Sequence, residues 1–118
     1  MTQPHKLRRP KVVSYFWGQM TWFADDEFKT GIGLSLAEMK VLAGQTSEAH
    51  SHDNCFEAIH VLRGSVVQNI GAREFELNEG ETCSVPPDVI HFTTNHGPQE
   101  AVLMLSYSVG TRNYTPAK

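Results

Sequence analysis

The stretch that decides the fold is GQTSEAHSHDNCFEAIHVLRG, residues 44–64. His50 and His52 flank a single residue, so on an extended chain both imidazoles leave the same face. Glu57 follows five residues later, after a turn-forming dipeptide. Imidazoles and a carboxylate are what divalent first-row metals take as ligands. The stretch therefore predicts a metal site.

A second stretch, GETCSVPPDVIHFTTN at residues 80–95, offers a fourth ligand in His91. A His-x-His pair alone would be read as ordinary polar residues, but three histidines and one carboxylate match a complete ligand set. No thiolate is included, so Fe, Mn, Ni, Co and Zn all remain possible metals. Because one carboxylate offsets only one of the metal's two charges, the centre would stay electrophilic and keep room for water or substrate.

Together these stretches resemble the paired motifs of the cupin superfamily. The first family motif is a glycine, five residues, His-x-His, three or four residues, a glutamate, six residues and a glycine, and it is matched at every position. The second is a glycine, five residues, Pro-x-Gly, two residues, a histidine, three residues and an asparagine. It is matched except at Asp88, where the family has glycine. Aspartate tolerates left-handed turns, so we expect the turn to survive. The matching positions are Gly44, His50, His52, Glu57, Gly64, Gly80, Pro86, His91 and Asn95.

The resemblance implies an all-β, single-domain cupin jelly-roll β-barrel with the metal inside. Short apolar stretches separated by Gly, Pro and Asn agree with it, since many short strands at near-regular spacing are typical of a sandwich or barrel. We expect a flexible N-terminal arm over residues 1–12, the barrel over 13–108 and an exposed C-terminal tail over 109–118. Beyond residue 46 the expected strands are 48–52, 56–62, 65–70, 73–76, 80–85, 91–96 and 100–107.

The segment 34–43 is ambiguous on its own. Its composition permits a helix, whereas Glu38 and Lys40 alternate with apolar neighbours as in a half-buried strand. The resemblance places a strand here, with Met39 and Val41 facing inward.

Three further residues are candidates for binding a substrate: Met39, Gln68 and Asn95. The resemblance implies that the strand face carrying Gln68 points into the barrel interior. A buried amide there must be hydrogen-bonded either to a ligand or to another side chain. Asn95 shares His91's face, and bracing a turn is the favoured reading of it. His60 lies three residues after Glu57 and is expected on the opposite face of the strand.

Tyr15, Trp17, Trp22 and Phe23 form the densest aromatic cluster in the chain. We favour edge-strand packing, including packing across a homodimer, over a wall of the substrate site. Small cupins often associate through N-terminal strands, so the resemblance points to the dimer as well. Cys55 lies between two predicted ligands, and a packed thiol is favoured over a contact with the metal.

Composition narrows the class of protein. At 118 residues and a net charge of −3, the chain has no basic surface for nucleic acid and no apolar run long enough to cross a bilayer. The basic start leads into no signal-peptide hydrophobic region, and the two cysteines are far apart. We therefore expect a reduced, cytoplasmic protein without a membrane partner.

These observations lead to two hypotheses on function. The first is a metal-dependent enzyme, such as an oxidoreductase of the dioxygenase type, a decarboxylase, an isomerase or a lyase, that acts on a small oxygenated compound chelating the metal. In it Glu57 stays a ligand or leaves the metal to act as a base. The alternative is a metal-loaded module that binds or senses a small molecule without turnover, since no acid–base pair beyond the ligands stands out.

Overall fold

The structure is a computed structural model, and it describes residues 6–7, 9–29 and 32–118. Apart from one 3₁₀ turn, Asp26–Phe28, its regular elements are strands. The strands in chain order are β1 (Lys11–Tyr15), β2 (Gly18–Ala24), β3 (Ser35–Val41), β4 (His50–Ser51), β5 (Glu57–Arg63), β6 (Ser65–Ile70), β7 (Arg73–Asn78), β8 (Thr82–Val85), β9 (His91–Thr94), β10 (Ala101–Tyr107) and β11 (Thr115–Pro116).

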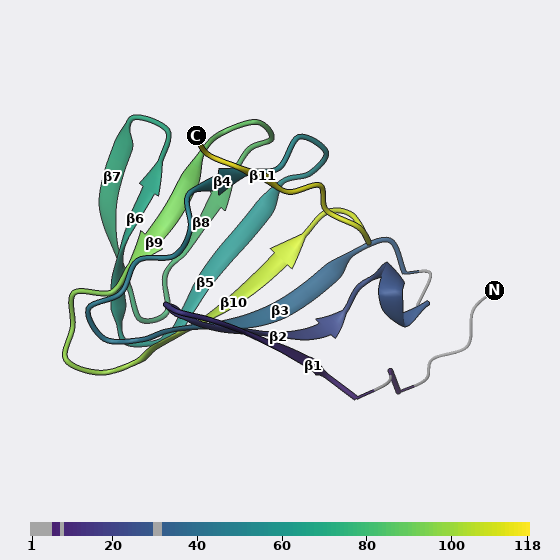
Figure 1. The fold of residues 1–118 in the computed structure, drawn as a ribbon, viewed down its shortest axis with the longest axis horizontal. Helices are drawn as coiled ribbons and strands as arrows, with labels where there is room; N and C mark the ends of the chain where they lie inside the picture. Colours follow the sequence, from purple (N-terminus) through teal and green to yellow (C-terminus); the bar gives the residue numbers. More distant parts are fainter. Residues whose placement is uncertain (1–5, 8, 30–31) are drawn as a thin grey trace.

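The strands form two antiparallel sheets that face each other, as Figure 1 shows. One sheet has the order β1-β2-β3-β10-β5-β8 and the other has the order β11-β4-β9-β6-β7. Consecutive strands β8, β9 and β10 alternate between the sheets, which is how a jelly roll closes. The prediction of an all-β jelly-roll barrel is confirmed.

The ambiguous segment 34–43 is a strand. β3 lies between β2 and β10 and pairs with both, so its backbone groups are used on either side. Its inward side chains, including Met39 and Val41, are buried, while Glu38 and Lys40 point outward. Pairing with the two neighbouring strands therefore decides the conformation of this segment, although its composition also permits a helix.

The core lies between the two sheets and is built from the inward-facing apolar residues of each. Leu103, Val61 and Ile59 are almost fully buried at its centre. Burial of such side chains stabilises the fold by about 1.5–3 kcal/mol each relative to exposure. The buried polar residues include three of the predicted ligands, His52, Glu57 and His91.

Both ends of the chain differ from the expected arm and tail. β1 begins at Lys11, whose ammonium group lies 2.9 Å from Glu27, so the sheet starts inside the range assigned to the arm. At the other end β11 pairs with β4, which draws residues 109–117 across the molecule (Figure 1). The C-terminal segment has no apolar alternation that marks a strand in sequence; pairing with the edge strand β4 forms it.

Asp88 adopts a φ of 70°, which confirms that aspartate accommodates the left-handed turn of the second motif. Its backbone N–H donates to the carbonyl of His52 at 2.8 Å. The turn therefore ties the second motif to the first.

Within the described part of the chain, no helix has the length and apolar character needed to span a membrane.

Candidate metal centre

The four predicted ligands come together between the two sheets. His50 and His91 are paired residues on neighbouring strands β4 and β9, and Glu57 begins β5 in the opposite sheet. His52 follows β4 directly. One ligand atom of each residue lies within 4.8 Å of those of the others. The jelly roll thus converts residues distant in sequence into one compact cluster.

Backbone carbonyls fix the orientation of all three imidazoles. His50 Nδ1 lies 2.7 Å from the carbonyl of Glu48, His52 Nδ1 lies 2.7 Å from that of Asn113, and His91 Nδ1 lies 3.0 Å from that of Val89. A carbonyl can only accept, so each Nδ1 carries the proton. When such a ring is neutral, its lone pair is on Nε2, the nitrogen left to bind a metal, as in metal-binding histidines.

The arrangement around Glu57 fits a metal ion. Its Oε1 lies 3.0 Å from His91 Nε2 and 3.4 Å from His52 Nε2. His52 Nε2 is buried and has no hydrogen-bond partner. A buried nitrogen of this kind is costly to leave unpaired, and a cation shared with Glu57 would satisfy it. The donor set is three imidazole nitrogens and one carboxylate, which divalent transition metals accept.

The pKa values show how the buried charges balance. Burial lowers the pKa of His50 to about 4, so this ring is neutral. Burial opposes the ionisation of Glu57, but contacts with His52 and His91 outweigh it and lower the carboxyl pKa to about 2. Burial also opposes the charge on His91, yet the hydrogen bond and charge of Glu57 outweigh it and raise this pKa above 6.5. Without metal, His91 and Glu57 form a buried ion pair.

We expect the metal-free protein to be most stable near pH 6.5. Below 6.5 the unfolded chain protonates His50 more readily than the folded one, and below 4.5 the same holds for Glu57, so stability falls with falling pH. Above 6.5 the folded state holds the His91 proton more tightly, so stability falls as pH rises through the raised pKa.

Melting curves of chelator-treated protein from pH 4 to pH 9 test this. In a metal-free His91→Gln variant the decline above pH 6.5 should be smaller. Stability that rises steadily from pH 6.5 to pH 8 in the wild type would contradict the buried ion pair.

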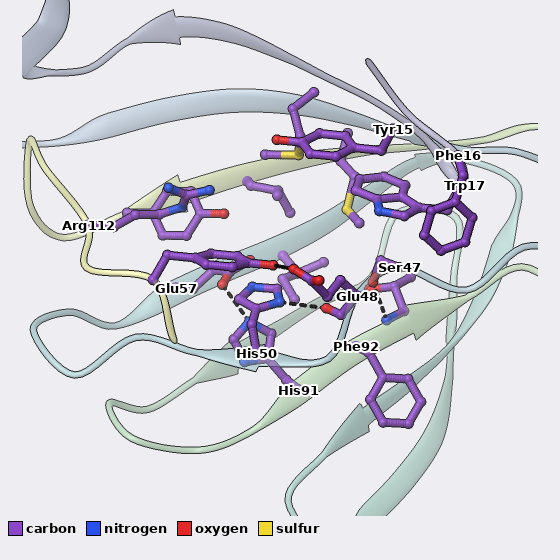
Figure 2. A pocket seen from close by; sticks show the side chains of 17 residues that line it. Tyr15, Phe16, Trp17, Ser47, Glu48, His50, Glu57, His91, Phe92 and Arg112 are labelled. Carbon is purple, nitrogen blue, oxygen red and sulfur yellow. Dashed lines mark hydrogen bonds and ion pairs between the residues drawn. The ribbon is translucent and has the colours of Figure 1, made fainter. Parts of the chain in front are cut away.

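The cluster opens onto a pocket of about 360 Å³. His50, Glu57 and His91 line one side of it (Figure 2). Trp17 and Arg112 lie at opposite ends of the view, with the ligands between them. The predicted ligands, an aromatic surface and a guanidinium therefore all border this pocket.

The three residues predicted to bind substrate behave differently from one another. Met39 lines the pocket. Gln68 is fully buried, but its amide is used internally: it accepts from the Thr93 hydroxyl at 2.7 Å and donates to the Phe92 carbonyl at 3.1 Å. Gln68 is not among the pocket-lining residues, so its hydrogen bonds serve other protein groups rather than the pocket.

Asn95 braces a turn, in agreement with the interpretation favoured from the sequence. Its Nδ2 donates to the carbonyls of Val41 and Gln99 at 2.9 and 2.8 Å, and its Oδ1 accepts from the N–H of Gly97 at 2.9 Å. All of its polar atoms are thereby engaged away from the pocket. Asn95 holds the loop between β9 and β10.

Edge-strand packing is the interpretation favoured from the sequence for the aromatic segment, and part of the segment lines the pocket instead. Tyr15 stacks on Trp17 with ring centroids 4.8 Å apart, and both line the pocket. Trp22 is buried against Tyr107. Phe16, at the tip of the β1–β2 hairpin, is 77% exposed. Tyr15 and Trp17 therefore form part of the wall of the pocket, which was the less favoured interpretation. The homodimer stays a prediction.

The two remaining expectations concern neighbours of the ligands. His60 contacts the hydroxyl of Thr82 at 2.7 Å and is absent from the ligand cluster, which agrees with an outward position. Cys55 is a buried free thiol and also lies outside the cluster. Burial raises its pKa, so the thiol stays protonated and packed.

Sequence reasoning missed the contribution of residues 110–116, which we call the C-terminal strap. Asn113 supplies the carbonyl that orients His52, Tyr114 stacks on His50 at 4.5 Å, and Arg112 lines the pocket. Thr111 anchors the strap by donating to Asp26 at 2.6 Å. The one available signal was the pair Arg112 and Tyr114 in a segment read as a solvated tail.

Comparison with known proteins agrees with this geometry. Residues 37–107 match the family model described as "Cupin domain". A germin-like protein 3-8 of Oryza sativa is 34% identical over 82 residues, covering 65% of this chain and 36% of that protein. An uncharacterized protein of Methanocaldococcus jannaschii is 31% identical over 67 residues, covering 57% and 54%.

Solved structures of oxalate decarboxylase share the fold. The Lactobacillus farciminis enzyme, solved as a formate complex, has a TM-score of 0.83 at 17% identity, covering 91% of this chain and 33% of that one. A Bacillus subtilis oxalate decarboxylase structure, described with Mn(II) centres, has a TM-score of 0.81 at 22% identity, covering 92% and 30%. This chain thus spans about a third to a half of these proteins. The paired motifs, the jelly roll and the family match agree: the chain belongs to the cupin family.

Proposed function

We propose that this protein is a metal-dependent enzyme that acts on a small oxygenated compound bound in the pocket. One observation carries the proposal: three of the four ligand residues, His50, Glu57 and His91, line a cavity of ligand size. A metal that only supports folding is enclosed by protein groups, whereas a catalytic metal keeps an open position facing the substrate. Pockets of roughly this volume are typical of small-molecule sites.

The four ligands would hold one divalent metal, and manganese is the first candidate because the similar oxalate decarboxylase structure is described with Mn(II) centres. When bound, the metal would polarise a carbonyl, enol or carboxylate oxygen of the substrate. The buried Glu57 carboxylate keeps the site from carrying two uncompensated charges. Met20, Met39 and Leu105 give the cavity an apolar wall that limits water around the reacting group.

Proton transfer would fall to few groups. Glu57 is ionised and is the one carboxylate of the cluster, so it would act as base if it leaves the metal. Burial raises the pKa of Tyr107 well above its usual value, which leaves this phenol a possible hydrogen-bond donor and a poor base. Decarboxylase, lyase, isomerase and dioxygenase chemistries are all compatible with one electrophilic metal and one carboxylate.

A second candidate function, ligand binding without turnover, has its own observation. Glu48, the other carboxylate lining the pocket, already accepts a hydrogen bond from Tyr114, and the guanidinium of Arg112 cannot deliver a proton. Among the described residues around the cavity this leaves no acid–base pair beyond the metal ligands. The lack of a separate acid–base pair favours a module that senses or stores a small molecule.

The test uses protein purified without a polyhistidine tag and loaded with Mn(II). We would screen diketones, enols, 2-oxo acids and small carboxylic acids for product by NMR and for oxygen uptake, in air and under argon. The enzyme reading predicts turnover that scales with bound metal, stops with chelator and is lost in Glu57→Gln, while a His60→Gln control stays active. Saturable binding of panel compounds without any product would contradict it in favour of the binding module.

A further inference from the structure

We propose that the pocket selects a small planar carboxylate, with its anionic group on Arg112 and its apolar body against Trp17. This inference rests on the proposed function, because it takes the cavity beside the metal cluster as the ligand site. It adds the chemical class of the ligand and names the specificity residue.

Arg112 is a partly buried cation with no anionic partner among the described residues. Its guanidinium lies over the rings of Trp22, Tyr107 and Tyr114, at 4.6, 5.3 and 5.4 Å from their centroids. Its Nε is buried without a hydrogen-bond partner, and no ion pair of Arg112 is found among the described residues. A guanidinium held in this way offers its N–H groups to a planar carboxylate.

The acidic side chains nearby are already engaged elsewhere. Asp26 accepts from Thr111 at 2.6 Å, and Asp53 accepts from the amide of Asn113 at 2.7 Å. Glu48 accepts from the Tyr114 hydroxyl. The strap therefore satisfies its neighbours' carboxylates with neutral donors and leaves the Arg112 charge for something else.

One layer of aromatic rings separates Arg112 from the metal ligands. The guanidinium contacts Tyr107 and Tyr114; the ring of Tyr107 lies 5.4 Å from that of His52, and the ring of Tyr114 lies 4.5 Å from that of His50. The guanidinium, these two rings and the ligand cluster therefore border the same cavity. Its volume of about 360 Å³ limits the ligand to a small molecule.

The rest of the pocket favours a flat, apolar body. Tyr15 and Trp17 stack with an interplanar angle of 5°, which presents aligned aromatic surface at the pocket wall. Met20, Met39 and Ile59 complete this side. Aromatic faces and thioethers pack well against unsaturated or aromatic carbon, but they offer no strong hydrogen bonds to the hydroxyl groups of a sugar.

Titration calorimetry of Mn(II)-loaded protein with benzoate and its neutral isostere benzamide tests the inference. In the wild type we expect benzoate to bind at least about tenfold more tightly than benzamide, because a charge-assisted pair is stronger than a neutral hydrogen bond. Arg112→Gln should reduce this preference by about tenfold, while Arg112→Lys, which keeps the charge, should retain part of it. Acetate, which lacks the planar body, should bind at least about tenfold more weakly than benzoate.

The matched control is Arg63→Gln, which removes an equal charge from an exposed residue at the end of β5, outside this pocket. It should leave both affinities unchanged. An unchanged benzoate preference in Arg112→Gln would overturn the role of Arg112, and equal affinity for acetate would overturn the aromatic body. Metal content and melting temperature are measured on the same samples. A wild type that binds neither Mn(II) nor any of Fe(II), Co(II), Ni(II) and Zn(II) would instead refute the proposed function, so the two failures are distinguishable.

Discussion

Replacing His91 by alanine is expected to weaken divalent metal binding by at least about a hundredfold. Loss of groups that merely orient a ligand costs about 10–100-fold in metal affinity, and His91 is one of the four ligands themselves. The substitution also leaves the buried Glu57 without its contact at 3.0 Å. The unfavourable burial of that carboxylate should lower the stability of the metal-free protein in addition.

His60→Ala is the matched control, since His60 lies on the same strand as Glu57 but outside the cluster. Competition with a chromophoric chelator measures both affinities, and circular dichroism reports whether each variant is folded. If the folded His91→Ala variant held metal as tightly as the wild type, the ligand set would be wrong.

Replacing Gly18 by alanine is expected to destabilise the protein by about 3 kcal/mol, near the upper end of overpacking costs, and to lower its melting temperature by about 10 °C. A Cβ at this position would lie 1.8 Å from the Lys40 carbonyl oxygen, which is backbone and cannot rotate away. Gly18 begins β2 opposite Val41 of β3. The preceding Trp17 would shift with it, so the aromatic wall of the pocket should be disturbed as well.

Gly33→Ala separates this clash from the general cost of losing a glycine. Gly33 has a φ of 75°, but nothing lies within 4 Å of an added Cβ. That variant should lose only about 1–2 kcal/mol. Thermal melts of both proteins decide the point, and equal losses would mean that the close approach at Gly18 does not limit stability.

The ligand cluster could be predicted from sequence because its information is local. Two histidines one residue apart, a glutamate at the family spacing and a histidine in the second motif fix the donor set without any coordinates. Strand parity also placed Met39 and His60 on the correct faces, since regular β-strands alternate strictly. The left-handed turn at Asp88 followed from the chemistry of its side chain.

The rest of the pocket depends on long-range packing that a sequence pattern does not encode. Parity put Gln68 in the interior but could not show that Thr93 and the Phe92 carbonyl use its amide. A tryptophan such as Trp17 is equally typical of a protein interface and of a pocket wall, so its residue type alone does not distinguish the two. Arg112 and Tyr114 lie in a segment without apolar alternation, so only the pairing of β11 with β4 reveals that the strap crosses the site.

The central claim is that His50, His52, Glu57 and His91 together hold one divalent metal beside the pocket. The most direct measurement is the metal content of untagged wild-type protein, by mass spectrometry of the elements after exhaustive dialysis, together with X-ray absorption at the edge of the bound metal. One equivalent per chain, coordinated by three imidazole nitrogens and at least one oxygen, is the predicted result. A folded protein that retains no metal, or a metal without imidazole ligands, would contradict it.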